Sequence, residues 1–152
     1  MPKLSEAAAG VYVIAVTPFT DSGALDFDST DRLVDFYLAA GVSGITVLGV
    51  MGEATKLTAA ESRTFTRRVL ARVGGQVPVA VGVSSPGFAA MGELTRAVVD
   101  DGAAGVMVAP APTVRTDAQI LDYFEGVADT LDRKSTRLNS SHSGESRMPS
   151  SA

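Results

Sequence analysis

The segment Gly49-Val50-Met51-Gly52-Glu53 has the residue types that best fit binding of a small ligand. Gly49 and Gly52 bracket a tight turn whose backbone N–H groups can face a ligand, and such a turn suits a carboxylate or a phosphate. Glu53 can act as an acid, a base or a cap. The alternative is an ordinary turn that uses glycine for its backbone freedom, with Glu53 in a structural hydrogen bond.

The remaining side chains exclude several kinds of catalytic centre. The only histidine is His142 and there is no cysteine, so neither a Ser-His-Asp triad nor a thiolate or histidine metal site is expected. We interpret Ser84 and Ser85 as loop residues. The chain has no G-x-G-x-x-G and no Walker loop, so it shows no sign of a dinucleotide or nucleotide site. We therefore expect no metal and no cofactor.

The chain has three lysines, Lys3, Lys56 and Lys134. A lysine that forms a Schiff base has to be desolvated to act as a neutral nucleophile near pH 7. None of the three lies at the end of an expected strand, so we expect no imine-forming residue in this chain.

Composition indicates a globular domain and argues against some partners. The 152 residues are 45% hydrophobic and carry a net charge of −4, which disfavours nucleic acid and anionic membranes as partners. No apolar run approaches the roughly 18 to 20 residues that a membrane span needs. An acidic residue, Glu6, stands where a signal peptide needs an apolar core, so we expect a cytoplasmic protein.

A change of composition divides the chain into residues 1–132 and residues 133–152. The second segment has seven serines among its twenty residues, too few apolar groups to offset its ordering entropy, and a positive charge. A basic tail for an anionic partner is one interpretation. We prefer a disordered, non-native segment, similar to read-through into sequencing-adapter DNA, and exclude it from the fold.

Four short β-branched runs predict strands buried on both faces, as in a parallel sheet covered by helices. Helical periodicity fills the gaps, a capping box begins at Thr58, and either Thr116 or Asp117 can cap the last helix. Gly41 and Gly102 follow two helices as left-handed caps. The expected strands are 11–16, 45–48, 77–81 and 106–109, and the expected helical stripes are Leu33/Phe36/Tyr37/Ala40, Phe65/Val69/Val73, Met91/Leu94/Val98 and Ile120/Tyr123/Phe124/Val127/Ala128/Leu131.

The resulting β-α-β-α-β-α-β-α order fits two α/β architectures. One is a small doubly wound, flavodoxin-like sheet, and the other is the first four units of a (β/α)₈ TIM barrel. In both, ligands meet the carboxyl ends of the strands. Those ends are Thr17-Pro18-Phe19, Gly49 to Glu53, Gly82 to Ser85, and Pro110-Ala111-Pro112.

Several motifs together resemble the dihydrodipicolinate synthase and N-acetylneuraminate lyase family. The similarity covers residues 10 to 131 in the correct order. It rests on Ala15-Val16-Thr17-Pro18-Phe19, Ala40-Gly41-Val42-Ser43-Gly44, the run from Leu48 through Gly52-Glu53 to Leu57-Thr58 and Glu61, Pro78-Val79-Ala80-Val81-Gly82-Val83, and Asp101-Gly102-Ala103-Ala104-Gly105 with Val106 to Pro110.

This resemblance implies a (β/α)₈ barrel, commonly tetrameric, that acts as a class I, Schiff-base-forming lyase or synthase on pyruvate or a related 2-keto acid. It implies that the strand-two loop, Gly49 to Glu53, with Thr17 beside it, holds the substrate carboxylate. The family's imine-forming lysine on strand six and proton-relay tyrosine after strand five would lie beyond this chain, so we expect a truncated, inactive copy without catalytic residues. The alternative is a small anion-binding module without enzymatic activity.

Two substitutions depart from the family pattern. Val50 and Met51 replace a pair of hydroxyl residues, so only their backbone amides remain to bind a carboxylate. Ala111 and Pro112 replace an aromatic pair. The first departure favours a relative of dihydrodipicolinate synthase with a different keto acid substrate.

Overall fold

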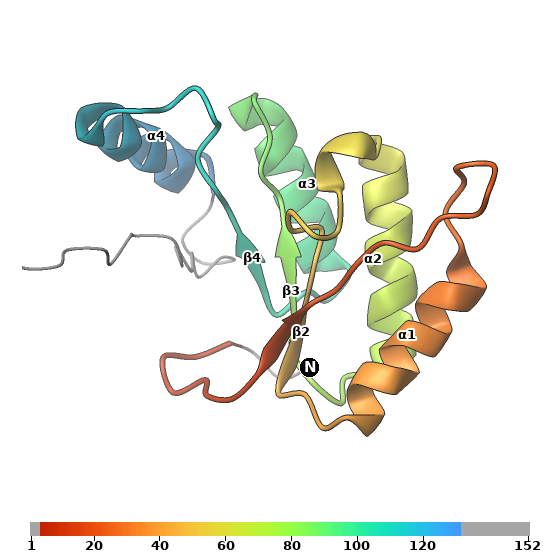
Figure 1. The fold of residues 1–152 in the computed structure, drawn as a ribbon. Coiled ribbons are helices and arrows are strands. Elements are labelled where there is room, and N and C mark those ends of the chain that lie inside the picture. The colour runs from red at the N-terminus through yellow and green to blue at the C-terminus, as the bar shows by residue number, and fades with distance from the viewer. Residues whose placement is uncertain (1–3, 132–152) are drawn as a thin grey trace, which may run out of the picture.

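Four parallel strands alternate with four α-helices along the chain (Figure 1). The computed structural model describes residues 4–131, so the expected tail lies outside the described residues, as do Lys3, Lys134 and His142. The elements are β1 (Tyr12–Ile14), α1 (Phe27–Ala39), β2 (Gly44–Val47), the 3₁₀ turn η1 (Ala54–Lys56), α2 (Ala59–Val73), β3 (Val79–Gly82), α3 (Phe88–Asp100), β4 (Gly105–Met107) and α4 (Asp117–Thr130).

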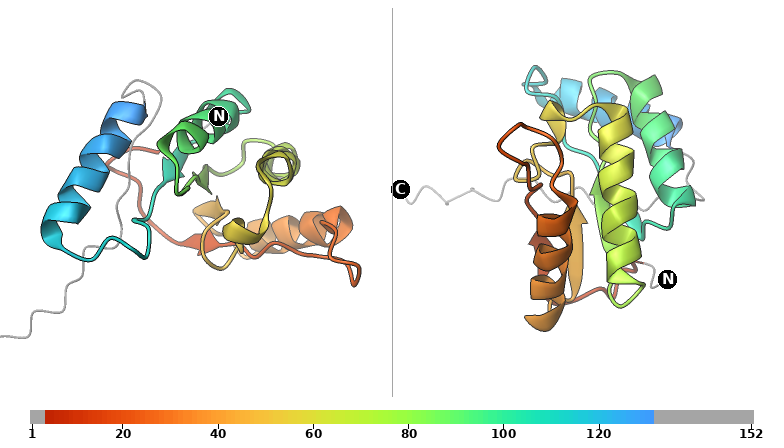
Figure 2. Two further views of the ribbon diagram at one scale, coloured as in Figure 1. Left: turned by 90° about the horizontal axis from the view of Figure 1, so that it is seen from above. Right: turned by 90° about the vertical axis from the view of Figure 1, so that its right-hand side faces the viewer.

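The strand order decides between the two expected architectures. The strands are hydrogen-bonded in the order β1-β2-β3-β4, all parallel, with Ile14 paired to Thr46, Thr46 to Ala80 and Gly82 to Met107. A flavodoxin-like sheet would run in the order 2-1-3 with helices on both faces. Here α1, α2 and α3 lie along one side of the sheet (Figure 2), so the doubly wound alternative is wrong and four units of a barrel are confirmed.

Local chemistry sets the helix ends as the sequence predicts. Thr58 and Glu61 form a capping box at α2, and Thr116 with Gln119 forms one at α4, so Thr116 rather than Asp117 is the cap. After α3, the N–H of Gly102 donates to the carbonyl of Val99 and that of Ala103 donates to Val98, as in a Schellman motif. Gly102 has a positive φ of 105°, which favours glycine there.

The core lies between the sheet and its helices, and it covers only one face of β1. Ile14 and Val16 remain 41% and 39% exposed, so the expectation of strands buried on both faces is wrong for this strand. The opposite face of the sheet has no helix layer in residues 4–131. The buried core includes Val34, Ile45, Val47, Phe65, Val69, Val73, Val79, Val81, Met91, Val98, Val106 and Val127.

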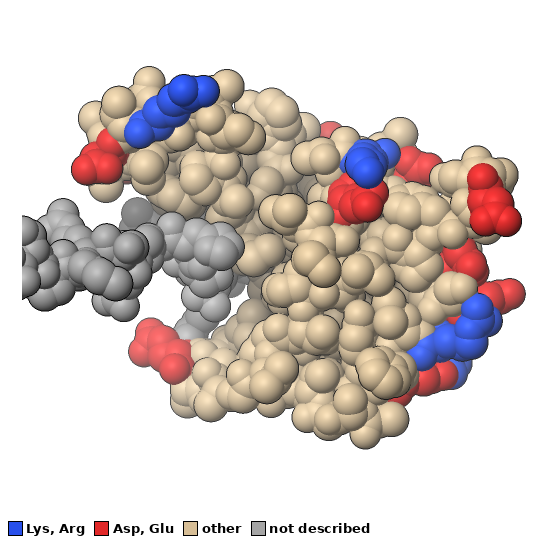
Figure 3. Space-filling view, viewed as in Figure 1, with Lys and Arg blue, Asp and Glu red and all other residues tan. Residues whose placement is uncertain are grey.

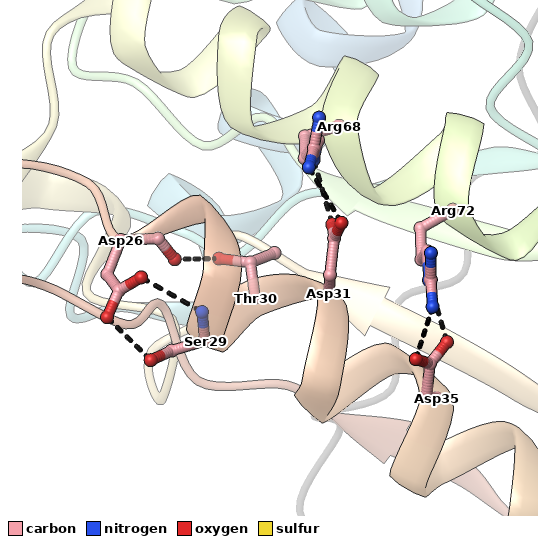
Figure 4. Close-up of polar contacts among 7 residues, drawn as sticks. All are labelled: Asp26, Ser29, Thr30, Asp31, Asp35, Arg68 and Arg72. Carbon is pink, nitrogen blue, oxygen red and sulfur yellow. Dashed lines mark hydrogen bonds and ion pairs between the residues drawn. The ribbon is translucent and has the colours of Figure 1, made fainter.

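The apolar stripe of α1 is also corrected by the structure. Phe36 is 65% exposed, whereas Thr30 and Val34 are buried against the core. On the flank of α1, the side chains of Asp31 and Asp35 meet α2 in ion pairs (Figure 4).

The arginines of α2 pair with acidic residues of α1 and of the segment after α3. Arg68 binds both carboxylate oxygens of Asp31 at 2.8 and 2.7 Å, and Arg72 binds Asp35 in the same manner. Arg63 and Arg67 both bind Asp101, after the end of α3. Hydrogen bonds from Arg67 and then Arg63 hold the pKa of Asp101 below its ordinary value. These pairs join α1 to α2 and α2 to the end of α3.

Within residues 4–131, none of the helices has both the length and the hydropathy to cross a membrane.

Candidate functional site

The turn from Leu48 to Glu53, at the carboxyl end of β2, has an unusual backbone conformation. Leu48 and Glu53 adopt the left-handed conformation, with φ of 56° and 52°, although neither is glycine. Such conformations persist only where the surrounding structure determines them. The Leu48 side chain is 3% exposed, so its burial anchors the start of the turn.

The backbone of this turn packs directly against Gly82, at the end of β3. A Cβ atom on Gly82 would lie 2.0 Å from the carbonyl oxygen of Leu48 and 2.7 Å from its carbonyl carbon. The absence of a side chain therefore lets the turn after β2 pack directly on the neighbouring strand. Sequence reasoning missed Leu48 and Gly82 as site residues, although a glycine at a strand position is a known sign of close backbone approach.

Thr17, which follows β1, holds the turn by a hydrogen bond. Its hydroxyl donates to the carbonyl oxygen of Gly52 at 2.7 Å, and the Thr17 side chain is buried. A Cβ on Gly52 would lie 3.0 Å from the backbone nitrogen of Leu48 and 3.3 Å from the carbonyl oxygen of Ala15. The predicted residues Thr17 and Gly52 are thus brought together, with Gly49 in the same turn.

The turn leaves two exposed residues, Val50 and Met51, whose backbone donors can meet a ligand. The N–H groups of Gly52 and Glu53 donate to the carbonyls of Gly49 and Val50, which removes them from the predicted set of free amides. Val50 and Met51, between them, donate no backbone hydrogen bond to the described residues. Val50 is 93% exposed and Met51 is 59% exposed, so an anion can approach this part of the turn. Consecutive free amides form a site that suits an anionic oxygen.

The charged side chains next to the turn pair with one another. Glu53 and Lys56 form an ion pair at 2.7 Å. The Glu53 side chain is 45% exposed and the Lys56 side chain is 70% exposed. This contact favours the structural interpretation of Glu53 over a role as acid or base. It also leaves Lys56 in water, unlike a desolvated Schiff-base lysine.

The other strand ends are tied together by polar contacts. The Ser84 hydroxyl accepts from the N–H of Ala109 at 2.9 Å, as expected for a loop residue. The Tyr123 hydroxyl of α4 donates to the Ala109 carbonyl at 3.1 Å, and burial raises the pKa of Tyr123. The contacts position the end of β4 but bring no further acid, base or nucleophile to the turn.

The side chains that lie against Gly49 are apolar and form a surface beside the turn, which we call the apolar floor. A Cβ on Gly49 would lie 3.4 Å from the Ile14 side chain and 3.5 Å from that of Met107. Among residues 4–131 there is no group of three His, Cys, Asp or Glu side chains placed to hold a metal ion. The arrangement can therefore bind a small anion at two amides above an apolar surface.

Comparison with known proteins gives one consistent result. The family model described as the dihydrodipicolinate synthetase family matches residues 7–135. The 4-hydroxy-tetrahydrodipicolinate synthase of Stenotrophomonas maltophilia is 38% identical over 122 residues, which is 80% of this chain and 41% of the relative. That of Sorangium cellulosum is 43% identical over 101 residues, or 66% of this chain and 34% of the relative.

Solved structures agree with this result. The crystal structure of dihydrodipicolinate synthase from Rhodopseudomonas palustris matches with a TM-score of 0.80 and 51% identity, over 85% of this chain and 42% of that chain. YagE, a family member from Escherichia coli solved in complex with pyruvate, matches with a TM-score of 0.75 and 32% identity, over 85% and 43% of the two chains. The chain thus spans about two fifths of the length of the relatives it matches.

Proposed function

The chain belongs to the dihydrodipicolinate synthetase family, and from this premise we propose that residues 4–131 supply the carboxylate-binding part of a lyase or synthase that acts on pyruvate or a related 2-keto acid. The observation that carries the proposal is the turn after β2, at the carboxyl ends of parallel strands, in which the amides of Val50 and Met51 donate no hydrogen bond within residues 4–131. Ligands of barrel enzymes bind at this end of the sheet. The pyruvate complex of YagE supports the choice of ligand.

The described residues can orient a substrate but cannot attack it. Two amides on a turn held by Thr17 and Gly82 would fix the carboxylate and direct the keto carbon along the apolar floor. In the class I mechanism that the resemblance implies, a desolvated lysine then forms an imine with that carbon. We propose that residues outside 4–131 supply this lysine in the family's enzymes, and that this chain alone is inactive.

Pyruvate should shift the backbone amide NMR signals of Val50 and Met51 in a ¹⁵N-labelled chain. The carboxylate forms hydrogen bonds with these N–H groups, whereas those of Gly52 and Glu53 are already bonded to carbonyls. Acetone, which has the keto group without the carboxylate, should leave the signals in place. Val50→Pro removes one donor and should weaken the effect, while Val50→Ala keeps the donor and should preserve it.

Two outcomes of that titration would contradict the proposal. Equal shifts with acetone and pyruvate would mean that the carboxylate is not what the turn binds. A stronger response to inorganic phosphate than to pyruvate would favour the alternative, a general anion-binding module without enzymatic activity.

Treatment of the chain with pyruvate and borohydride should leave Lys56 without a covalent adduct. Its side chain is 70% exposed and paired with Glu53, so it lacks the desolvation that an imine-forming lysine requires. Peptide mass spectrometry measures the result. Formaldehyde with the same reductant should methylate Lys56 and so confirm that the reduction works. A pyruvate-derived mass on Lys56 would refute the assignment.

Two further features of the whole protein remain predictions. A homo-oligomer, commonly a tetramer, follows from the family resemblance. A cytoplasmic location follows from composition.

A further inference from the structure

The apolar floor lies directly beside the proposed carboxylate site. A carboxylate bound by the amides of Val50 and Met51 is within two residues of Gly49. Among the described residues, and apart from Gly49 and its chain neighbours, the only atoms within 4 Å of a Cβ on Gly49 are Cγ2 of Ile14 and Cε of Met107. Ile14 belongs to β1 and Met107 to β4, so apolar side chains from both sides of the sheet converge on the turn.

Gly82 allows the Met107 side chain to reach the turn. Gly82 is the register partner of Met107, and it lies on β3, between β4 and β2. Because Gly82 has no side chain, the thioether of Met107 can extend across β3 to Gly49. Thr46 is paired with Ile14 but is only 5% exposed, so it offers little polar surface beside the floor.

The surroundings of the floor offer little to pair with a polar substrate. The charged side chains next to the turn, Glu53 and Lys56, pair with one another. Figure 3 shows a broad area without charged groups across the middle of the molecule, with the charged groups at its margins. A hydroxyl or a second carboxylate placed on the floor would therefore lose water without gaining a partner, which costs free energy.

We propose that the site selects 2-keto acids whose chain beyond the keto carbon is an alkyl group larger than methyl, a selectivity that rests on the proposed function of the turn. The two amides hold the carboxylate, and the carbon chain that extends from it lies on the floor of Ile14 and Met107. An added methylene gains burial against these side chains, whereas a hydroxyl in the same place loses hydration. 2-Oxobutanoate therefore binds more tightly than pyruvate or hydroxypyruvate.

Amide titrations of the ¹⁵N-labelled 152-residue chain with these three keto acids test the selectivity. 2-Oxobutanoate and hydroxypyruvate are a matched pair, because a methyl group in the first replaces a hydroxyl in the second. Measured from the Val50 and Met51 signals, 2-oxobutanoate should bind about threefold more tightly than pyruvate, as for one buried methylene. Hydroxypyruvate should bind about tenfold more weakly than 2-oxobutanoate, as for a hydroxyl that loses water without a partner.

The outcomes distinguish the selectivity from the proposed function. If pyruvate binds but the matched pair binds equally, or hydroxypyruvate binds more tightly, the selectivity is overturned and carboxylate binding stands. If none of the three acids shifts the Val50 and Met51 signals, both are overturned.

Variants of the floor test where the selectivity comes from. Met107→Gln keeps the length of the side chain and adds a polar group, so the preference for 2-oxobutanoate over hydroxypyruvate should fall from about tenfold to near unity. Ile14→Thr should reduce the preference in the same direction. The control is Val11→Gln, which adds a polar side chain just before β1, at the opposite end of the strand from the turn, and should retain the preference. A dispersed amide spectrum shows that each variant is folded. A preference that persists in both floor variants would overturn the role of the apolar floor.

Discussion

Gly82→Ala should lower the free energy of unfolding by about 3 kcal/mol, at the upper end of the range for overpacking. The added Cβ would lie 2.0 Å from the carbonyl oxygen of Leu48. The atoms it meets belong to the backbone, so a change of rotamer cannot relieve the contact. Either β3 must move away from β2 or the turn after β2 must change its conformation.

Urea unfolding followed by circular dichroism, at one protein concentration, measures this effect. Gly87→Ala is the matched control, because no atom lies within 4 Å of the added Cβ and its φ of −111° is open to alanine. The control should change stability by about 1 kcal/mol or less, because Gly87 is the N-cap of α3, where alanine is less favourable than glycine. Equal stability of the two variants would show that Gly82 does not constrain the turn.

The sequence predicts the features of this fold that depend on local chemistry. Thr58 and Glu61 form the capping box that their spacing indicates, and Gly41 and Gly102 end helices with positive φ. The repeat of these glycines before β2 and β4 also marks where strands begin. Residues near one another in sequence make these contacts, so spacing alone carries the information.

Contacts between distant elements are where sequence reasoning fails. The ion pairs between α1 and α2 join residues 37 positions apart, and the exposure of Phe36 depends on which elements pack against α1. The roles of Leu48 and Gly82 depend on two adjacent strand ends that meet through their backbones. Periodicity describes one element at a time and cannot specify either contact. The choice between barrel and doubly wound sheet is of the same kind, because strand order is a property of the whole sheet.

The candidate site also combines features that the sequence predicts with features that only the folded structure reveals. The resemblance points to the run from Gly49 to Glu53, but only the folded turn distinguishes amides bonded within it from those left free. The bonded pair, Gly52 and Glu53, stiffens the turn, and the free pair, Val50 and Met51, faces outward. Under the proposed function, the turn keeps a backbone that binds a carboxylate while its side chains are apolar in place of the family's hydroxyl pair.

Thr17→Val should lower the free energy of unfolding by about 1–3 kcal/mol, because the buried carbonyl of Gly52 loses its hydrogen-bond donor. The same change should weaken the response of the Val50 and Met51 amides to pyruvate. Valine keeps the shape of threonine, so packing against the neighbouring strands changes little and the effect reports the hydroxyl. Urea unfolding and the amide titration measure the two quantities on the same protein.

Thr17→Ser provides the control, since serine retains the donor and loses only a methyl group. It should recover most of the pyruvate response, although its stability can fall by the loss of that methyl group. If Thr17→Val lowers stability but leaves the pyruvate response intact, the hydroxyl supports the fold without positioning the amides. A loss of the response in Thr17→Val that Thr17→Ser restores would instead tie carboxylate binding to the single hydrogen bond that joins the end of β1 to the turn after β2.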